Sequence, residues 1–160
     1  MSDNTQLLAS ITTFLNTEAD MLDHKEYQDW LDLWTDTGLY IVPAEHNKKD
    51  YKNSLNIAYD NAVMRSMRVE RLQSGEAIST EIGGTTIRTV SRFRLLSDVD
   101  GIITVRCAYA LFENNKNGIR TFPADVEFKL VRNGDSFKIE QKVINVMKSA
   151  EYLTTVSYLF

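Results

Sequence analysis

The segment from Glu18 to Pro43 constrains the fold of this chain most strongly, because it predicts two helices, a turn and a strand in close succession. Asp23 lies three residues before Glu26, which is the spacing of a capping box, and this predicts that a new helix begins there. The apolar side chains that follow share one helical face: Tyr27, Trp30, Leu31 and Trp34. Such a face must pack against another layer of structure.

The first part of the chain therefore divides into two helices and a strand. An apolar stripe at helical spacing predicts a long amphipathic helix over residues 5–22, followed by the capped helix over residues 24–35. Gly38 ends that helix or follows its end. The short apolar run that stops at Pro43 predicts a strand over residues 38–43.

A third helix is predicted over residues 61–73, with Asp60 as its N-cap and Gly75 just after its end. Its apolar residues are expected to face inward: Val63, Met64, Met67 and Leu72. Residues 44–59 are polar and aperiodic, and they predict a long loop of the kind that serves either function or contact between subunits.

From Thr85 onward the hydrophobic period changes from 3.6 to 2, which predicts four strands within residues 85–146. The alternation places Arg88, Arg92 and Arg94 on one face of the first of these strands. Helices followed by a meander predict a single α+β domain over residues 1–160, in which the helices cover one face of a curved antiparallel sheet.

Composition excludes several classes of protein. The chain is 43% hydrophobic and 25% charged, as in globular domains, and its apolar runs are too short to span a bilayer. A net charge of −4 provides no general attraction to nucleic acid. The first residues lack a basic stretch followed by an apolar stretch, so we expect no secretory signal, no membrane association and a cytoplasmic location.

The chain also lacks the side chains that redox metal sites require. It contains His24, His46 and a single cysteine, Cys107, which stands in an apolar strand and is expected to be a buried thiol. A Rieske cluster or an iron site built from two histidines and a carboxylate cannot be assembled from this set alone. We therefore predict no metal and no cofactor in this chain.

Several short motifs resemble a known family. The first group is Glu18-Ala19, Leu22-Asp23, Tyr27, Asp29-Trp30-Leu31 and Tyr40-Ile41-Val42-Pro43, and the second is Arg68-Val69, Arg71-Leu72, Ser74-Gly75, Arg88-Thr89-Val90-Ser91 and the final Val156-Ser157-Tyr158-Leu159-Phe160. They are similar to motifs of the small (beta) subunit of aromatic-ring-hydroxylating dioxygenases, whose fold is the cone-shaped nuclear transport factor 2-like fold. Arg92 departs from the family pattern, which usually has Asn there.

The resemblance implies a structural subunit with no catalysis of its own. In that family a large (alpha) subunit carries the Rieske 2Fe-2S cluster and the mononuclear iron, and three copies of each subunit form a hetero-hexamer on a trimer of small subunits. It also implies a use for Arg88, Arg92 and Arg94 in pairing with carboxylates of a neighbouring subunit, and for Tyr158 and Phe160 in apolar contacts. The alternative is that these arginines face water.

A second hypothesis is a stand-alone dehydratase, isomerase or cyclase that acts on a small apolar substrate in the mouth of the cone. Its acid and base would come from Tyr27, Tyr40, Asp60 or His46, with Trp30 nearby. Each of these residues also has an ordinary structural role, as core packing or as a helix cap, and we prefer that role. A third hypothesis is a binding module for a small apolar ligand. The sequence does not name an aromatic substrate.

Overall fold

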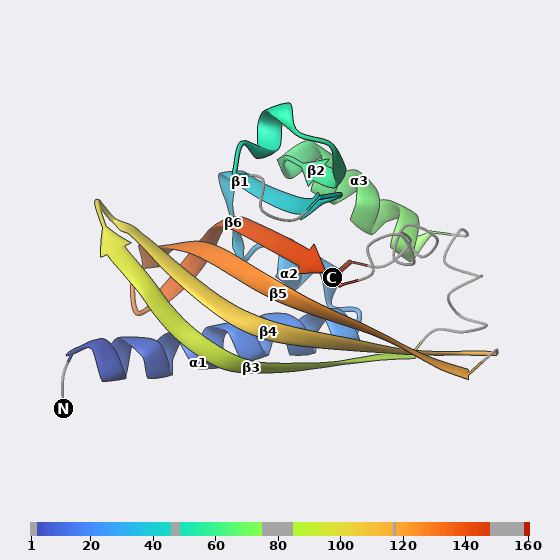
Figure 1. Ribbon diagram of the computed structural model, residues 1–160, viewed down its shortest axis with the longest axis horizontal. Coiled ribbons are helices and arrows are strands. Elements are labelled where there is room, and N and C mark those ends of the chain that lie inside the picture. The colour runs from blue at the N-terminus through green and yellow to red at the C-terminus, as the bar shows by residue number, and fades with distance from the viewer. Residues whose placement is uncertain (1–2, 46–48, 75–84, 117, 148–158) are drawn as a thin grey trace.

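The computed structural model describes residues 3–45, 49–74, 85–116, 118–147 and 159–160. Its six described strands form one sheet in the order β2-β1-β6-β5-β4-β3 (Figure 1). Strands β1 and β6 run parallel, and the other neighbours run antiparallel. The elements are α1 (Asp3–Asp23), α2 (Tyr27–Leu31), β1 (Trp34–Pro43), the short 3-10 helix η1 (Tyr51–Asn53), β2 (Asn56–Asp60), α3 (Ala62–Gln73), β3 (Thr85–Val99), β4 (Ile102–Asn115), β5 (Gly118–Asn133) and β6 (Ser136–Val146).

The core lies between the sheet and α1, which runs along the long strands in Figure 1. Helix α1 contributes Ile11 and Leu15, both fully buried. Every second residue of β4 points into the same core: Ile103, Val105, Cys107, Tyr109 and Leu111. Burying each large apolar side chain contributes about 1.5–3 kcal/mol, so this layer supplies most of the driving force for folding.

The break between the first two helices occurs where the sequence predicts it, but the capping box does not form. Glu26 is the N-cap of α2 and makes no side-chain capping bond. The Asp23 carboxylate instead accepts hydrogen bonds from the Arg88 main-chain nitrogen at 2.8 Å and from the Thr86 hydroxyl at 3.1 Å. Lys25, whose φ is 59°, turns the chain between the helices. The Asp23 carboxylate, which the sequence predicts to cap the second helix, therefore pairs with β3 instead.

The predicted helix over residues 24–35 is wrong after Leu31, because Trp34 already begins β1. Gly38 neither ends a helix nor follows one directly; it lies within that strand. A Cβ atom at Gly38 would stand 2.8 Å from the Ile139 carbonyl oxygen and 2.9 Å from the Trp34 ring. Glycine is therefore needed for the close approach of β1 to β6. Pairing with β6 overrides the helical periodicity, which is a local signal.

Helix α3 matches its predicted range closely, yet its cap and its inward face differ from the prediction. The N-cap is Asn61, whose side chain accepts a hydrogen bond from the Met64 main-chain nitrogen at 3.0 Å, whereas Asp60 ends β2. The residues buried by the fold are Arg65 and Val69. Three residues predicted to face inward are exposed instead: Val63, Met64 and Met67.

Strand β3 does not keep the three arginines on one face. Arg92 has a φ of 58°, and the pairing of β3 with β4 shifts register between Ser91 and Arg94. This bulge changes the alternation of the strand. Arg88 consequently points into the core and is 8% exposed, while Arg92 and Arg94 are exposed. Residues 44–59, predicted as a loop, also contain η1 and most of β2.

We predict that Asn61→Ala lowers the free energy of unfolding by about 0.5–2 kcal/mol, because it removes the capping acceptor of α3. Asn61→Asp keeps an acceptor at the same position and should stay within a few tenths of a kcal/mol of the wild type. Urea denaturation followed by circular dichroism measures both variants. Equal stability of Asn61→Ala and the wild type would contradict the assignment of this cap.

Candidate functional site

The interior of the fold contains a buried ion pair between α1 and β6. Glu18 and Lys142 are both 0% exposed, and Lys142 Nζ lies 2.7 Å from Glu18 Oε2. The same carboxylate accepts a hydrogen bond from the Trp30 indole at 2.8 Å and another from the Tyr109 hydroxyl at 2.5 Å. Three donors therefore surround Glu18, and they come from α2, β4 and β6.

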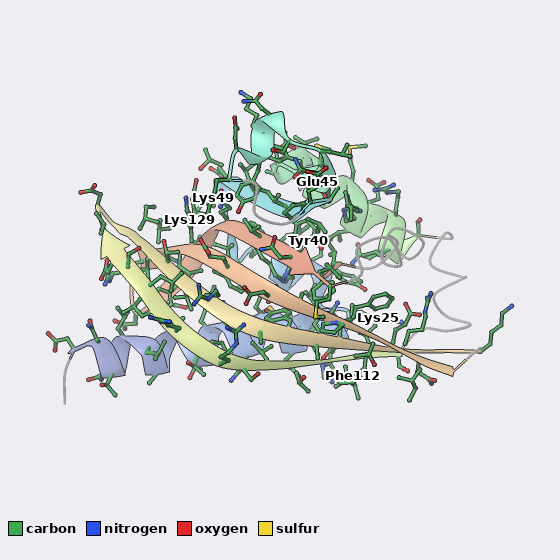
Figure 2. The ribbon with its side chains drawn as sticks, viewed as in Figure 1. Lys25, Tyr40, Glu45, Lys49, Phe112 and Lys129 are labelled. Carbon is green, nitrogen blue, oxygen red and sulfur yellow. The ribbon has the colours of Figure 1, made fainter. Side chains whose placement is uncertain are left out.

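Phe160 lies in the same interior and is fully buried. Its main-chain oxygen accepts a hydrogen bond from Lys142 at 3.0 Å, and its main-chain nitrogen donates to the Tyr40 hydroxyl at 2.8 Å. Its ring stacks on Tyr109 with 6.3 Å between ring centroids. Figure 2 labels Tyr40 near the middle of the molecule, where β1 pairs with β6 and Tyr40 is the register partner of Lys142.

Burial sets the protonation behaviour of this cluster. It lowers the pKa of Lys142, while the Glu18 charge acts in the opposite sense. Burial also raises the pKa of Tyr109 well above its ordinary value, and the Glu18 charge adds to that increase. The same cause raises the pKa of the Cys107 thiol to about 12. The Tyr109 hydroxyl and the Cys107 thiol therefore keep their protons near neutral pH, which suits a structural role better than proton transfer.

A second ion pair, buried on the arginine side and partly buried on the aspartate side, joins α1 to β3. Arg88 Nη1 lies 2.5 Å from Asp23 Oδ1, and Arg88 Nη2 donates to the main-chain oxygen of Leu159. Arg88, one of the predicted interface residues, thus satisfies groups of its own chain. Tyr27 lies beside this pair, and burial raises its pKa.

The remaining predicted site residues around α3 also have structural partners. Asp60 is 1% exposed and pairs with Arg68 at 2.6 Å. Arg65 lies over the Trp34 ring at 4.2 Å and donates to the Gly38 carbonyl, and burial lowers the pKa of Arg65 to about 10. Trp30 packs edge to face on Trp34 with 5.4 Å between ring centroids. Asp60 also lines an open groove of about 470 Å³ along α3, together with Met64, Met67 and Arg68.

Arg92 lies on the other face of the sheet, where an open groove of about 670 Å³ runs over β3, β4 and β5. It pairs with Asp125 at 2.5 Å, with both side chains more than half exposed. The small side chains of Ala108 and Ala110 form part of the floor of this groove. Arg94 is exposed. Two further candidates, Tyr158 and His46, lie outside the described residues.

Sequence reasoning missed the central pair, Glu18 and Lys142. The signal was present in α1, because Glu18 occurs at helical spacing from Ile11, Leu15 and Leu22, so a carboxylate stands on the apolar stripe. Lys142 is harder to detect, since the alternation of β6 predicts it to face outward with Lys138 and Glu140. The pairing of β5 with β6 shifts register between Lys129 and Leu130. This irregularity accompanies the change in which residues of β6 face the core.

One group of possible metal ligands occurs within the described ranges. Asp20, His24 and Glu26 are all exposed at the end of α1. His24 already hydrogen-bonds to the Asp20 carbonyl oxygen at 2.9 Å, and this bond together with the Asp20 charge raises its pKa. The set contains no cysteine, so it does not match the ligands of a Rieske cluster.

Comparison with known proteins identifies the family. Residues 17–150 match the model of the ring hydroxylating beta subunit. The chain therefore belongs to the ring hydroxylating beta subunit family, and the predicted role as a subunit of a ring-hydroxylating dioxygenase is confirmed.

Solved structures show that the fold is shared. The beta subunit of benzoate 1,2-dioxygenase from Burkholderia mallei is 21% identical, with a TM-score of 0.77 over 94% of this chain and 96% of that chain. Naphthalene 1,2-dioxygenase with indole bound in its active site is also 21% identical, with a TM-score of 0.77 over 92% of this chain and 82% of that chain. A putative scytalone dehydratase from Novosphingobium aromaticivorans is 10% identical, with a TM-score of 0.65 over 90% of this chain and 86% of that chain. The predicted cone-shaped nuclear transport factor 2-like fold is confirmed.

Among the helices of the described ranges, none is both long and apolar enough to cross a membrane.

We predict that Lys142→Met lowers the free energy of unfolding by about 3–5 kcal/mol, because it leaves the Glu18 carboxylate buried without its cation. The double variant Glu18→Gln/Lys142→Met removes both charges and keeps both shapes, so it should recover most of that loss. Urea denaturation of the two single variants and the double variant measures the coupling. Additive losses would show that the two side chains do not act as a pair.

We also predict that Cys107 does not react with a disulfide reagent at pH 8 in the folded chain, since a pKa of about 12 leaves almost no thiolate. The unfolded thiol has a pKa of about 8.5. Between these two values the unfolded chain loses a proton that the folded chain keeps, so Cys107 lowers the free energy of unfolding as the pH rises. Rapid stoichiometric labelling without denaturant would contradict this, and Cys107→Ala provides the unlabelled control.

Proposed function

We propose that this chain is the assembly subunit of an aromatic-ring-hydroxylating dioxygenase and performs no catalysis itself. The observation that carries the proposal is the family match over residues 17–150, which spans most of the fold. The interior supports it, because three donors engage the Glu18 carboxylate and Phe160 fills the space beside it.

The iron cofactors are assigned to the large alpha subunit. A Rieske 2Fe-2S cluster takes two cysteine and two histidine ligands, whereas this sequence has one cysteine and two histidines. That cysteine is Cys107, which lies fully buried in β4. The residues of this chain therefore do not fit the cluster, and the large subunit is expected to hold both the cluster and the mononuclear iron.

The expected assembly is a trimer of this chain that carries three large subunits. Arg88 and Phe160 are buried within their own chain, so we no longer propose that they contact a neighbouring subunit. Arg92 and Arg94 remain candidates on the exposed face of β3, where a carboxylate of a neighbouring subunit can compete with or join the Arg92–Asp125 pair. A cytoplasmic location also stays a prediction.

A stand-alone dehydratase, isomerase or cyclase is the alternative. The likeness to the scytalone dehydratase concerns the fold alone at 10% identity. Of its proposed catalytic groups, Asp60 is paired with Arg68, and the Tyr40 hydroxyl accepts a hydrogen bond from Phe160. Both residues are about 1% exposed. These contacts leave them with structural roles.

We predict that the chain purified alone contains no iron and no Rieske absorption, and that it captures the large subunit when the two are co-expressed. Iron content, visible absorption and affinity capture through a tag on this chain are the measurements. Stoichiometric iron that survives chelation in the isolated chain would overturn the proposal. A chain that captures no large subunit would also overturn it.

The matched variants Tyr27→Phe and Tyr40→Phe remove one hydroxyl each and test the alternative within that experiment. The assembled complex should keep its arene turnover within about twofold in both variants, since neither hydroxyl takes part in proton transfer in this account. Loss of turnover in a complex of normal composition and stability would instead support chemistry inside the cone.

A further inference from the structure

The outer face of the sheet holds two arginines that stand directly opposite each other on neighbouring strands. Arg94 of β3 is the register partner of Arg106 of β4, and we call these two residues the arginine pair. Val105 and Cys107, on either side of Arg106, are buried in the core, so Arg106 points to the outer face, where it lines the open groove. Two like charges in this arrangement repel each other, so the pair is unfavourable in an isolated chain.

The carboxylates of the same groove do not form ion pairs with the arginine pair. Asp125 lies 2.5 Å from Arg92 and is therefore already paired. Glu127 is the register partner of Arg106 on β5, yet no ion pair joins these two side chains. Among the ion pairs of the described residues, none includes Arg94 or Arg106. The arginine pair thus carries two positive charges without a bonded carboxylate in the described part of the chain.

A group of carboxylates with the opposite charge lies at the junction of α1 and α2. Carboxylate oxygens of Asp20 and Glu26 lie within 4.8 Å of each other, both side chains are exposed, and Asp29 adds a carboxylate in the first turn of α2. We call these three residues the acidic cluster. His24, which lies 3.2 Å from Asp20, and the exposed Lys25 offset part of its charge. The crowded carboxylates repel each other, as the two arginines do.

Within one chain the arginine pair and the acidic cluster belong to different sides of the sheet. Helix α1 packs on the core side, whereas Arg106 lines the groove on the outer face, and no ion pair of the described residues joins the two groups. A protein group that neutralises either of them therefore comes from another molecule. A second copy of this chain provides the complement of both, because it presents adjacent carboxylates to adjacent guanidinium groups.

We propose that the acidic cluster of one copy binds the arginine pair of the next copy, so that the open groove is a contact between copies of this chain. The proposal rests on the proposed function, whose assembly contains a trimer of this chain, and it adds the two surfaces that meet. Because these surfaces differ, the contact is heterologous. Heterologous contacts build rings such as a trimer when the rotation closes, whereas a twofold dimer joins identical surfaces. Arg106 thus joins Arg94 as a contact residue.

Exchange of the charges tests the contact on the full chain by analytical ultracentrifugation. Arg94→Glu/Arg106→Glu places carboxylates opposite the acidic cluster, so self-association should weaken on the order of tenfold or more. Asp20→Arg/Glu26→Arg places cations opposite the arginine pair and should weaken self-association in the same way. The variant with all four changes restores opposite charges across the contact, so it should regain the mass of the wild type. High salt should weaken association of the wild type, since these charges are exposed or partly exposed.

Two further variants separate the contact from effects on folding and on net charge. Arg71→Glu/Lys116→Glu makes the same change in net charge as the double arginine-to-glutamate variant, at exposed positions outside both groups, and it should associate like the wild type. Arg94→Gln/Arg106→Gln removes the repulsion between the arginines and adds no charge. It should associate more weakly than the wild type, while its thermal melting at a concentration at which both are monomers should show no loss of stability.

A wild-type chain that stays monomeric at every concentration would overturn the proposal, as would full association of both charge-reversal variants. A variant with all four changes that folds normally and stays dissociated would also overturn it. If Arg94→Glu/Arg106→Glu keeps its self-association and loses capture of the large subunit, the groove binds the large subunit instead. These results are separate from the proposed function, which fails if the wild-type chain captures no large subunit or holds iron of its own.

Discussion

The buried ion pair of Glu18 and Lys142 is the interaction on which the interior of this fold depends. It ties α1 to β6, and the same carboxylate gathers donors from α2 and β4. Removing one partner of such a pair leaves a charge in an apolar interior, at a cost comparable with a large part of the stability of a domain. The pair therefore helps to fix how α1 and α2 sit on the sheet.

The same arrangement explains why a cone that resembles enzymes can serve as a scaffold. In a catalytic cone a base must reach a substrate proton. Here Glu18 is surrounded by donors, and the Tyr40 hydroxyl accepts from Phe160. The family match gives the function, and the geometry gives a physical reason for the absence of a free base in the part of the interior that the structure describes.

Much of the fold could be predicted from local patterns. Period-two alternation placed the four long strands, and the cap signals placed α3 within a residue of its observed start. The errors arose where long-range contacts compete with local signals. Asp23 could cap a helix, but it pairs with Arg88 instead. The apolar stripe that includes Trp34 has helical spacing, but pairing with β6 places Trp34 in β1. The bulge at Arg92 has no clear local signal, and it separated Arg88 from the other arginines.

The candidate site was less predictable, because its central residues are charged groups at positions that are normally apolar or exposed. The direct test of the account is the arene turnover of the assembled complex that contains Glu18→Gln/Lys142→Met, which removes both charges of the central ion pair and approximately preserves the side-chain shapes. A scaffold role predicts an intact assembly with turnover within about twofold of the wild type, since no proton passes through these side chains. An intact assembly with its turnover lost would contradict the account and assign chemistry to this chain.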